Sequence, residues 1–499
     1  MGSLENFITK HDRKVYRLLE ILPGFVSWNL ILFPYWGILI IPEVVAYFIL
    51  AYNIYWFYQS FQIAVTLFIS HFRIKASKNY EWLRDLKTFP DWQKVHHLVI
   101  VPTYKEPLKT LNRTFKSLAK QTMPKKQISV VLATELREDE DVREKKIKFI
   151  KSKYGKVFAN LFVTTHELKG KEVAGKSSNE RFAAIYAKKK LVDEKKMDIR
   201  YMTVTSCDAD SKFHPKYLSC LAFGFLDNPD RFKRFWQSPI MYYNNIWEIP
   251  AITRVPNTFG SMWNMSQLPR KDRLINMSTY SLSLKLLDEV DYWDADKIPE
   301  DWGLFFKAFY KERGGLEVEA IYLPTHVDAA QSTSFFKTIK NQYEQYKRWA
   351  WGTSDDPWII KNYLTIPGIP FWEKTMRLIN VIWSHFLWPV NWFIITVGLT
   401  LPSLLNPRFA RTALGYTVPK LSSYVLTVAL VFLVIMLVFD YMYKPPTPKN
   451  YPRWKVIFGP LEFVLMPIVG FIFSALPGLD AHTRLMMGKY IEYRVTEKV

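Results

Sequence analysis

The sequence predicts an α/β domain inserted between N-terminal and C-terminal membrane helices. Three observations predict it. Long apolar segments lie towards both ends of the 499-residue chain, the charged middle contains short apolar runs, and helical segments separate those runs. Short apolar runs bounded by turn signals are typical of buried parallel strands. Their alternation with helices indicates a doubly wound, Rossmann-like sheet, whose ligands bind beyond the carboxyl ends of the strands.

Composition narrows the class of protein further. The chain is 49% hydrophobic and carries a formal charge of +21. Such a charge is common in proteins that bind nucleic acid, but no zinc-ligand spacing or RNP motif accompanies it, so we expect no nucleic-acid partner. The basic residues instead flank the apolar segments, as in proteins that face an anionic membrane surface. Two cysteines, Cys207 and Cys220, give no disulfide framework and favour a reducing compartment.

The N-terminal part predicts an amphipathic segment over 1–24, then a hairpin of two membrane helices over 25–72 that turns at Pro42 and Glu43. The apolar stretch is too long for a signal peptide and lacks a small-residue cleavage site. A buried helix pair in a soluble protein is the alternative. Basic residues flank the hairpin on both sides: Lys10, Arg13, Lys14 and Arg17 before it, and Arg73, Lys75 and Lys78 after it. They place the N-terminus and the central domain on the cytoplasmic side.

The C-terminal part predicts interfacial helices over 356–384 and a membrane region over 385–477. Two spans are expected there, at 385–405 and 424–443. A third apolar stretch, 456–476, contains Pro460 and Pro467 and is followed by Pro477. It suits a span, a re-entrant segment or a surface segment equally. Residues 478–499 form the remaining tail.

Three strands are expected in the central domain, at 97–101, 128–132 and 199–205, with a helix over 109–121 joining the first two. The third strand leads into Asp208 and Asp210. Two aspartates spaced by one residue at a strand end suit a divalent cation and a ribose, because hard cations prefer carboxylates plus substrate oxygens. The alternative is a solvated turn that caps the next helix.

Two helix starts carry further candidate residues. Gly175 and Lys176 begin a helix whose amides and ammonium suit a phosphate, although an ordinary helix start would look the same. Glu300 and Asp301 open a helix over 302–310. A carboxylate there suits removal of a proton from a hydroxyl, and helix capping is the alternative.

Together with Gln345-x-x-Arg348-Trp349, these acids resemble a known family. Glu135, Asp208-x-Asp210, Glu300-Asp301 and the Gln-x-x-Arg-Trp sequence look like a membrane-integrated family 2 glycosyltransferase of the cellulose, hyaluronan and chitin synthase type, over about residues 95–499. The resemblance implies a GT-A fold for the domain at 73–355. It also implies that Trp349 lies under the acceptor sugar and that Arg348 lies near the diphosphate, as a guanidinium suits phosphate geometry.

The resemblance assigns the remaining roles residue by residue. Asp301 with Glu300 is the catalytic pair, with Asp301 the general base; Asp208 and Asp210 hold Mg²⁺ or Mn²⁺; and Trp302 joins Trp349 on the acceptor side. The residues expected to bind the nucleotide sugar are Pro102, Thr103, Tyr104, Glu106, Glu135, Lys176, Asp208, Gln345 and Arg348. Glu135 stands where the family usually has Asp, and Pro-Glu-Asp replaces its Thr/Ser-Glu-Asp. The segment 276–284 resembles the part that precedes the acceptor-facing loop.

The end of the chain is similar to the gating loop of cellulose synthases, which reads F-x-V-T-x-K-G. The corresponding residues here are Tyr493, Val495, Thr496 and Lys498. The likeness implies a cytoplasmic tail. A charged terminal tail without a role is the alternative.

The resemblance implies inverting transfer of a sugar from a nucleotide donor, UDP-linked, to a growing β-linked polysaccharide. Single transfer to a lipid acceptor, such as a polyprenyl phosphate or ceramide, is the alternative, and a non-enzymatic transporter or scaffold is a remote one. The expected partners are the nucleotide sugar, a glycan or lipid acceptor, and membrane lipid. The expected location is the plasma (inner) membrane, with the catalytic domain in the cytoplasm.

Overall fold

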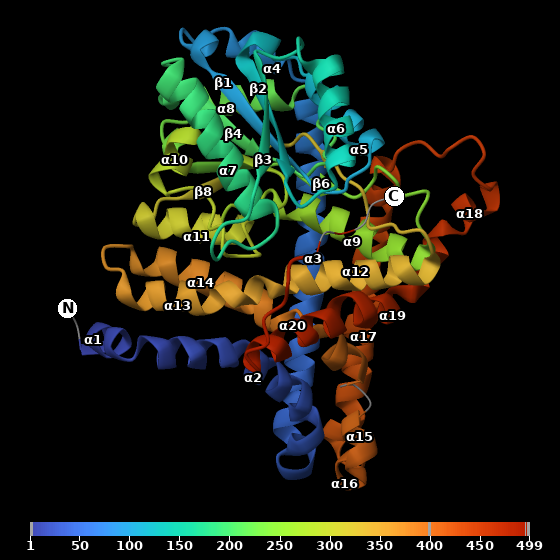
Figure 1. The fold of residues 1–499 in the computed structure, drawn as a ribbon. Helices are drawn as coiled ribbons and strands as arrows, with labels where there is room; N and C mark the ends of the chain where they lie inside the picture. The colour runs from blue at the N-terminus through green and yellow to red at the C-terminus, as the bar shows by residue number, and fades with distance from the viewer. Residues whose placement is uncertain (1–2, 398–400, 495, 497–499) are drawn as a thin grey trace.

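The computed structural model describes residues 3–397, 401–494 and 496. It places an α/β domain over a layer of helices that lie across the molecule, and long helices project from that layer (Figure 1). The expected mixed α/β fold with helices of membrane-spanning length on both sides is therefore confirmed.

The central sheet has seven strands in the order β3-β2-β1-β4-β7-β5-β8. Strands β1 to β4 are parallel to one another, and β7 is antiparallel to both of its neighbours, β4 and β5. The strands are β1 (His96–Thr103), β2 (Ile128–Glu135), β3 (Asn160–His166), β4 (Met202–Ser206), β5 (Arg234–Gln237), β7 (Tyr280–Ser283) and β8 (Glu317–Ala320). The three strands expected from the sequence are β1, β2 and β4. A separate small parallel pair joins β6 (Ile240–Met241) to β9 (Thr325–His326).

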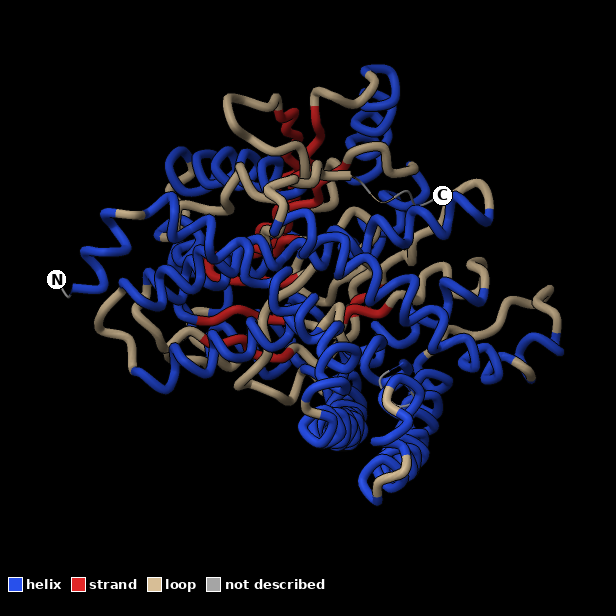
Figure 2. The backbone as a smooth tube through the Cα atoms, turned by 90° about the horizontal axis from the view of Figure 1, so that it is seen from below, coloured by secondary structure: helices blue, strands red, loops and turns tan. Residues whose placement is uncertain are grey.

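Helices cover both faces of the sheet (Figure 2). They are α5 (Leu108–Ala119), α6 (Glu140–Tyr154), α7 (Lys176–Lys188), α8 (Tyr217–Asp227), α10 (Leu284–Glu289) and α11 (Asp301–Lys311). Alternate residues of one strand point to opposite faces. In β1, Leu98 and Ile100 join the core on the side of α7, α10 and α11, whereas Val99 and Val101 join the core on the side of α5, α6 and α8. Burial on both faces explains the continuous apolar runs.

Two long helices follow the N-terminal α1 (Ser3–Lys10). They are α2 (Asp12–Ile40) and α3 (Pro42–Asn79), and they meet at the turn that the sequence predicts. The later helix α17 (Ala413–Tyr443) lies beside α3, where Phe57 and Phe61 pack on Phe432 (Figures 1 and 2). Within the described residues, three segments are long and apolar enough to cross a membrane: Asp12–Ile40, Ala413–Tyr443 and Gly459–Met486. Helix α3 contains Asn53, Gln59 and Gln62, which lower its hydropathy.

The layer beneath the α/β domain is formed by α9 (Ala251–Gln267), α12 (Phe335–Ala350), α13 (Asp356–Thr365), α14 (Phe371–Leu387) and α20 (Leu476–Met486). The segment Gly459–Met486 also includes α19 (Met466–Gly470). It runs across the direction of α3 and α17 and packs under α12, which fits a surface or re-entrant segment better than a span (Figure 1). Short helices complete the chain, namely α4 (Trp82–Leu86), α15 (Leu401–Leu405), α16 (Pro407–Ala410) and α18 (Arg453–Ile457).

One expected span differs from the structure. The sequence predicts a single helix over 385–405, but α14 ends at Leu387, a turn follows at 388–390, helical structure resumes over 391–397, and α15 starts at Leu401. Pro389 explains the break, because a proline inside a helix removes a hydrogen bond and clashes with the preceding turn. Residues 398–400, within this expected span, lie outside the described residues.

Candidate active site

Three parallel strands deliver candidate residues to one edge of the sheet. Strand β1 ends at Thr103, β2 ends at Glu135, and β4 ends at Ser206, two residues before Asp208. The register pairs Thr103 with Thr134 and Ile100 with Ser206, so the carboxyl ends of the three strands lie together. Of the predicted residues, Pro102 is still inside β1, paired with Ala133.

Lys176 supplies a positive charge at this edge of the sheet. Its Nζ lies 3.1 Å from an oxygen of Asp208 and 3.2 Å from an oxygen of Glu300, and it donates to the carbonyl of Ser278. Burial lowers the pKa of Lys176, but the carboxylates of Asp208, Glu180 and Glu300 outweigh this, so its pKa is well above the usual value. The lysine is therefore charged at the junction of α7, β4 and α11.

Asp301 begins α11 next to Glu300 and is held by two amides. Its Oδ2 accepts from the backbone N–H of Ser278 at 3.0 Å, and its Oδ1 accepts from that of Trp302 at 2.9 Å. Burial, with a further contribution from the charge of Glu300, raises the pKa of Asp301 to about 6. A carboxyl group with this pKa is ionised near neutral pH and is basic enough to accept a proton.

Ser278 joins these groups into one cluster. Its Oγ donates to Asp208 at 2.6 Å, its N–H donates to Asp301, and its carbonyl accepts from Lys176. The backbone of Ser278 has φ +57°, which lets one residue face all three partners. Ser278 was not predicted individually, but it falls in the segment 276–284 that the sequence singles out.

Asp210 lies deeper than Asp208 and is 1% exposed. Its Oδ2 accepts from the N–H of Asp328 at 2.8 Å, and its carbonyl accepts from the side chain of Asn244 at 3.0 Å. Within the described residues, no group of three or more His, Cys, Asp or Glu side chains gathers as a metal cluster. Two hard carboxylate groups nevertheless fit Mg²⁺ or Mn²⁺, since Mg²⁺ sites commonly use one or two carboxylates plus substrate phosphates.

A second group of predicted residues lies at the ends of β1 and β2. The hydroxyl of Thr103 donates to Glu106 at 2.8 Å, and burial raises the pKa of Glu106 to about 7. Glu135 is buried, which raises its pKa, and it pairs with Arg137. The Arg137 guanidinium lies 4.5 Å from the centre of the Tyr104 ring. The flat tyrosine and the charged pair suit a base and a ribose.

Helix α12 carries the Gln-x-x-Arg-Trp residues. Gln345 is buried and accepts from Gln342 at 3.0 Å. The ring of Trp349 lies 4.8 Å from that of Tyr346 and 5.9 Å from that of Tyr242. These three aromatic rings form a partly exposed group that suits the face of a sugar.

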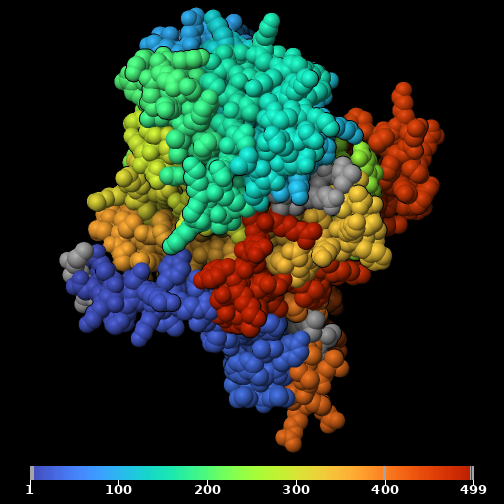
Figure 3. Space-filling model, in the orientation of Figure 1, coloured from blue at the N-terminus to red at the C-terminus, as the bar shows by residue number. Residues whose placement is uncertain are grey.

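The C-terminal tail reaches Arg348. The guanidinium donates to the hydroxyl of Tyr493 at 3.1 Å and to Thr496 at 3.4 Å, and it lies 5.0 Å from the centre of the Tyr493 ring. The Tyr493 ring also packs on Gly175, where an added Cβ would lie 3.0 Å from it. The red end of the chain lies against the green and teal part of the domain in Figure 3. Val495 and Lys498 lie outside the described residues.

The Trp302 ring contacts α14, and the Trp349 ring contacts Tyr242 and Tyr346. The Trp302 ring stacks on His385 of α14, with centroids 5.1 Å apart and planes 24° apart. His385 in turn bonds to Asp356 at 2.7 Å. The structure therefore brings Asp301, Glu300, Lys176 and Asp208 together, but it sets the Trp302 ring against the helix layer.

Glu180 is a further buried acid that sequence reasoning missed. It is 0% exposed, and both of its oxygens lie 2.9 Å from the hydroxyl of Ser206. Burial raises the pKa of Glu180 to about 8, and the charge of Lys176 opposes this rise. The one available signal was its position four residues after Lys176, on the same face of α7.

Comparison with known proteins bears on the class of protein. Residues 203–443 match the family described as Glycosyl transferase family group 2. The match contains Asp208, Asp210, Glu300, Asp301 and the Gln345 to Trp349 segment, and it extends to the end of α17. It supports a glycosyltransferase of family 2. No curated protein matches the chain.

Several solved structures are similar in part. The mannosyltransferase PcManGT from Pyrobaculum calidifontis, in complex with GDP-Man and Mn²⁺, is 12% identical, with 78% of this chain and 98% of that chain covered at a TM-score of 0.41. S. aureus TarS 1-349 with UDP-GlcNAc is 14% identical, with 72% and 98% covered at 0.38. GalNAc-T7 with UDP, GalNAc and Mn²⁺ is 13% identical, with 59% and 56% covered at 0.34. The ligands named are those of these proteins.

Proposed function

We propose that the chain is a membrane-embedded inverting glycosyltransferase that moves a sugar from a UDP-linked donor to a growing β-linked polysaccharide. The observation that carries this proposal is the cluster around Ser278, which holds a charged lysine, an acid at a strand end and a candidate base together. The family match supports the reaction class.

In this proposal, the donor diphosphate binds between α7 and α12. Lys176 at the start of α7 and Arg348 of α12 supply positive charge to the phosphate oxygens, and Tyr104 with Arg137 receives the base. Asp208 and Asp210 hold Mg²⁺ or Mn²⁺, which when bound neutralises charge on the departing diphosphate. Tyr493 and Thr496 of the tail, which contact Arg348, cover this side as part of a gating segment. Val495 and Lys498, which the sequence assigns to the same segment, lie outside the described residues.

Asp301 is the proton acceptor in this proposal. The acceptor hydroxyl oxygen forms a bond to the anomeric carbon while the bond from that carbon to the diphosphate breaks, and the hydroxyl proton moves to Asp301. The two amides on Asp301 hold its carboxylate in one orientation for this step. Attack from the side opposite the leaving group inverts the anomeric carbon. Trp349, with Tyr242 and Tyr346, supports the acceptor sugar.

Single transfer to a lipid acceptor is the second candidate. One observation favours it: within the described residues of the C-terminal part, α17 is the one long uninterrupted helix, and the segment Gly459–Met486 runs across it. Few helices are then left to surround a polysaccharide. The acceptor of this second candidate is a polyprenyl phosphate or a ceramide-like lipid.

The proposed location follows from the basic flanks of the N-terminal hairpin. They favour a catalytic domain in the cytoplasm and a chain integrated in the plasma (inner) membrane. The long apolar helices support membrane integration.

The experiment is nucleotide release by the purified protein in lipid nanodiscs, with a panel of UDP- and GDP-sugars and Mg²⁺ or Mn²⁺. We expect release from one donor, and we expect Asp301→Asn to abolish it. Asp296→Asn, an exposed aspartate in the preceding loop, is the matched control. A polymeric product supports the synthase, and an organic-soluble glycolipid supports the second candidate. No release from any donor, even with native lipid extract added, would contradict a transferase.

A further inference from the structure

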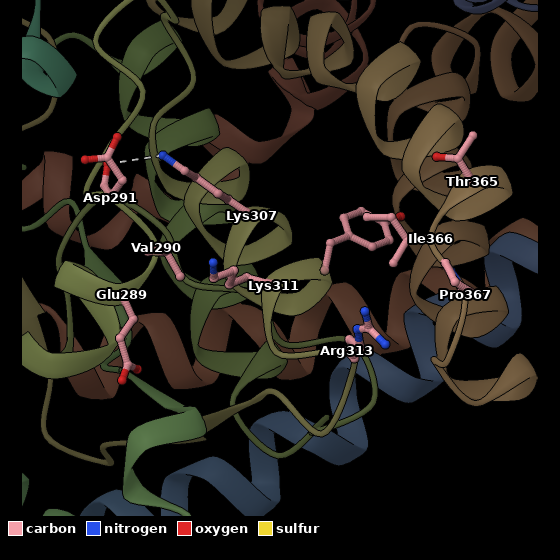
Figure 4. A pocket seen from close by; sticks show the side chains of 10 residues that line it. Glu289, Val290, Asp291, Lys307, Lys311, Arg313, Thr365, Ile366 and Pro367 are labelled. Carbon is pink, nitrogen blue, oxygen red and sulfur yellow. Dashed lines mark hydrogen bonds between the residues drawn. The ribbon is translucent and has the colours of Figure 1, made fainter. Parts of the chain in front are cut away.

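A cavity of about 670 Å³ lies at the far end of α11, away from Asp301. Figure 4 shows its two sides: residues 289–291, at the end of α10, and residues 365–367, at the end of α13. Lys307, Lys311 and Arg313 of α11 and the turn after it add three positive charges to the lining. The volume is within the range of small-ligand sites, about 300 to 1,000 Å³.

Most charges around the cavity are already compensated. Asp291 pairs with Arg181 at 2.9 Å, and Glu289 pairs with Lys285 at 3.4 Å. Lys307 pairs with Asp294 at 2.7 Å and donates to two backbone carbonyls, one of which is drawn in Figure 4. The acids of the lining are therefore neutralised by side chains outside it.

Lys311 and Arg313 differ from the other charges. Over the part of the chain that the structure describes, neither side chain makes an ion pair. Both side chains are exposed to solvent, so they are free to pair with an anionic ligand that carries one or two negative charges.

The turn after α11 places Arg313 near the start of α14. Arg313 has φ +55°, and Gly314 and Gly315 continue with φ +92° and +71°. The N–H of Gly315 donates to Glu373 of α14 at 2.7 Å. An added Cβ at Gly368, in the turn before α14, would lie 3.5 Å from the guanidinium of Arg313. A non-glycine residue in the left-handed region, such as Arg313, is uncommon, and such residues recur at ligand-binding sites.

The exposed face of α14 indicates that the cavity lies near the membrane surface. It exposes four large apolar side chains at helical spacing along one face: Trp372, Met376, Ile379 and Trp383. Trp383 donates to the hydroxyl of Tyr55 in α3, and α3 packs along α17, which is a candidate membrane helix. An exposed apolar face of this kind suits a helix in the membrane interface. The cavity at the start of α14 is then close to the lipid headgroups.

We propose that this cavity binds a phosphate group carried by a membrane lipid, through Lys311 and Arg313. A guanidinium matches phosphate oxygens with two parallel hydrogen bonds, and an ammonium adds a point charge. Basic pockets beside membrane helices are suited to anionic headgroups. This proposal does not depend on the reaction of the distant site.

The experiment counts lipid molecules retained by the purified full chain in native mass spectrometry. The protein in detergent is titrated with phosphatidic acid, with phosphatidylglycerol or with phosphatidylcholine. We expect one anionic lipid to bind with an affinity that falls about tenfold or more in Lys311→Gln/Arg313→Gln, since each hydrogen bond to a charged group has at least this effect. Lys145→Gln/Lys148→Gln on α6 removes the same charge elsewhere and should leave binding unchanged.

A further variant and a competition with inorganic phosphate distinguish the possible results. Arg313→Lys keeps the charge but loses the two-bond geometry, so it should weaken binding less than the double change. Equal lipid retention by the wild type and the double variant would overturn the site, and so would equal binding of phosphatidylcholine and the anionic lipids. Displacement of the lipid by equimolar inorganic phosphate would overturn a lipid as the source of the phosphate. Circular dichroism of each variant verifies its fold.

Discussion

At the residue scale, the pKa of Asp301 makes the reaction sensitive to acid. Burial and Glu300 raise this pKa to about 6, so the carboxyl group loses its basic form as the pH falls through this value. We expect kcat/KM to rise from pH 5 to pH 7 with a midpoint of about 6 and then to level. The measurement is initial nucleotide release across this range. A midpoint near the ordinary aspartate value of 3.8 would contradict Asp301 as the base.

Ser278 gives a second prediction at the same scale. Ser278→Gly removes the 2.6 Å hydrogen bond to Asp208 but suits the left-handed backbone at this position. We expect kcat to fall by about tenfold or more, because a hydrogen bond to a charged group contributes about 1.5 to 3 kcal/mol. Ser278→Ala also removes the bond but keeps a Cβ in the left-handed backbone, as serine does, whereas Ser278→Gly relieves about 1 to 2 kcal/mol of strain, so the alanine variant should have the lower thermal stability of the two. If Ser278→Gly keeps full activity, the hydroxyl has no role in the site.

At the scale of elements, the helix layer braces the first turn of α11. The Trp302 ring stacks on His385, Asp356 bonds to His385, and an added Cβ at Gly303 would lie 3.1 Å from Asp355. Helices α13 and α14 thus contact the two residues that follow Asp301. The orientation of the proposed base depends on helices outside the α/β domain.

This arrangement predicts different effects for two changes at His385. His385→Ala removes the stacking on Trp302, and we expect kcat to fall by about tenfold with KM for the donor unchanged, which is about 1.4 kcal/mol in the barrier. His385→Phe keeps a ring against Trp302 and should retain more activity than alanine. Steady-state kinetics of both variants measure this. Equal losses in the two variants would contradict a role for the stacked ring.

The elements also show what the sequence can predict. Strands β1, β2 and β4 are buried on both faces, so their apolar runs identify them. Asp208 and Asp301 stand directly after a strand and at a helix start, where local signals exist. Ser278 and Arg137 have no such signal, because their roles arise from contacts made by the fold. The tail contact of Tyr493 with Arg348 joins residues 145 positions apart. The family resemblance singles out each of the two residues but does not predict that they meet.

At the scale of the whole molecule, a buried aspartate of α17 forms a hydrogen bond with the α/β domain. Asp440 is 3% exposed near the end of this helix, and its Oδ1 accepts from the hydroxyl of Tyr243, which follows β6. Its other oxygen pairs with Lys444 at 2.5 Å. Asn244, the next residue after Tyr243, donates to the carbonyl of Asp210. A short path of contacts therefore connects the membrane part to the proposed metal ligand.

Tyr243→Phe tests this connection. The change leaves the Asp440 and Lys444 pair in place but removes one buried hydrogen bond to a carboxylate, a loss of about 1.5 to 3 kcal/mol. We expect the midpoint of thermal unfolding in nanodiscs to fall by several degrees, as a loss of this size usually lowers it. Tyr80→Phe removes a hydroxyl that bonds to Asp85 at an exposed site, and it should leave the midpoint unchanged. If both variants melt together with the wild type, the contact does not hold the domain to α17, and the packing of α3 along α17 must carry the attachment alone.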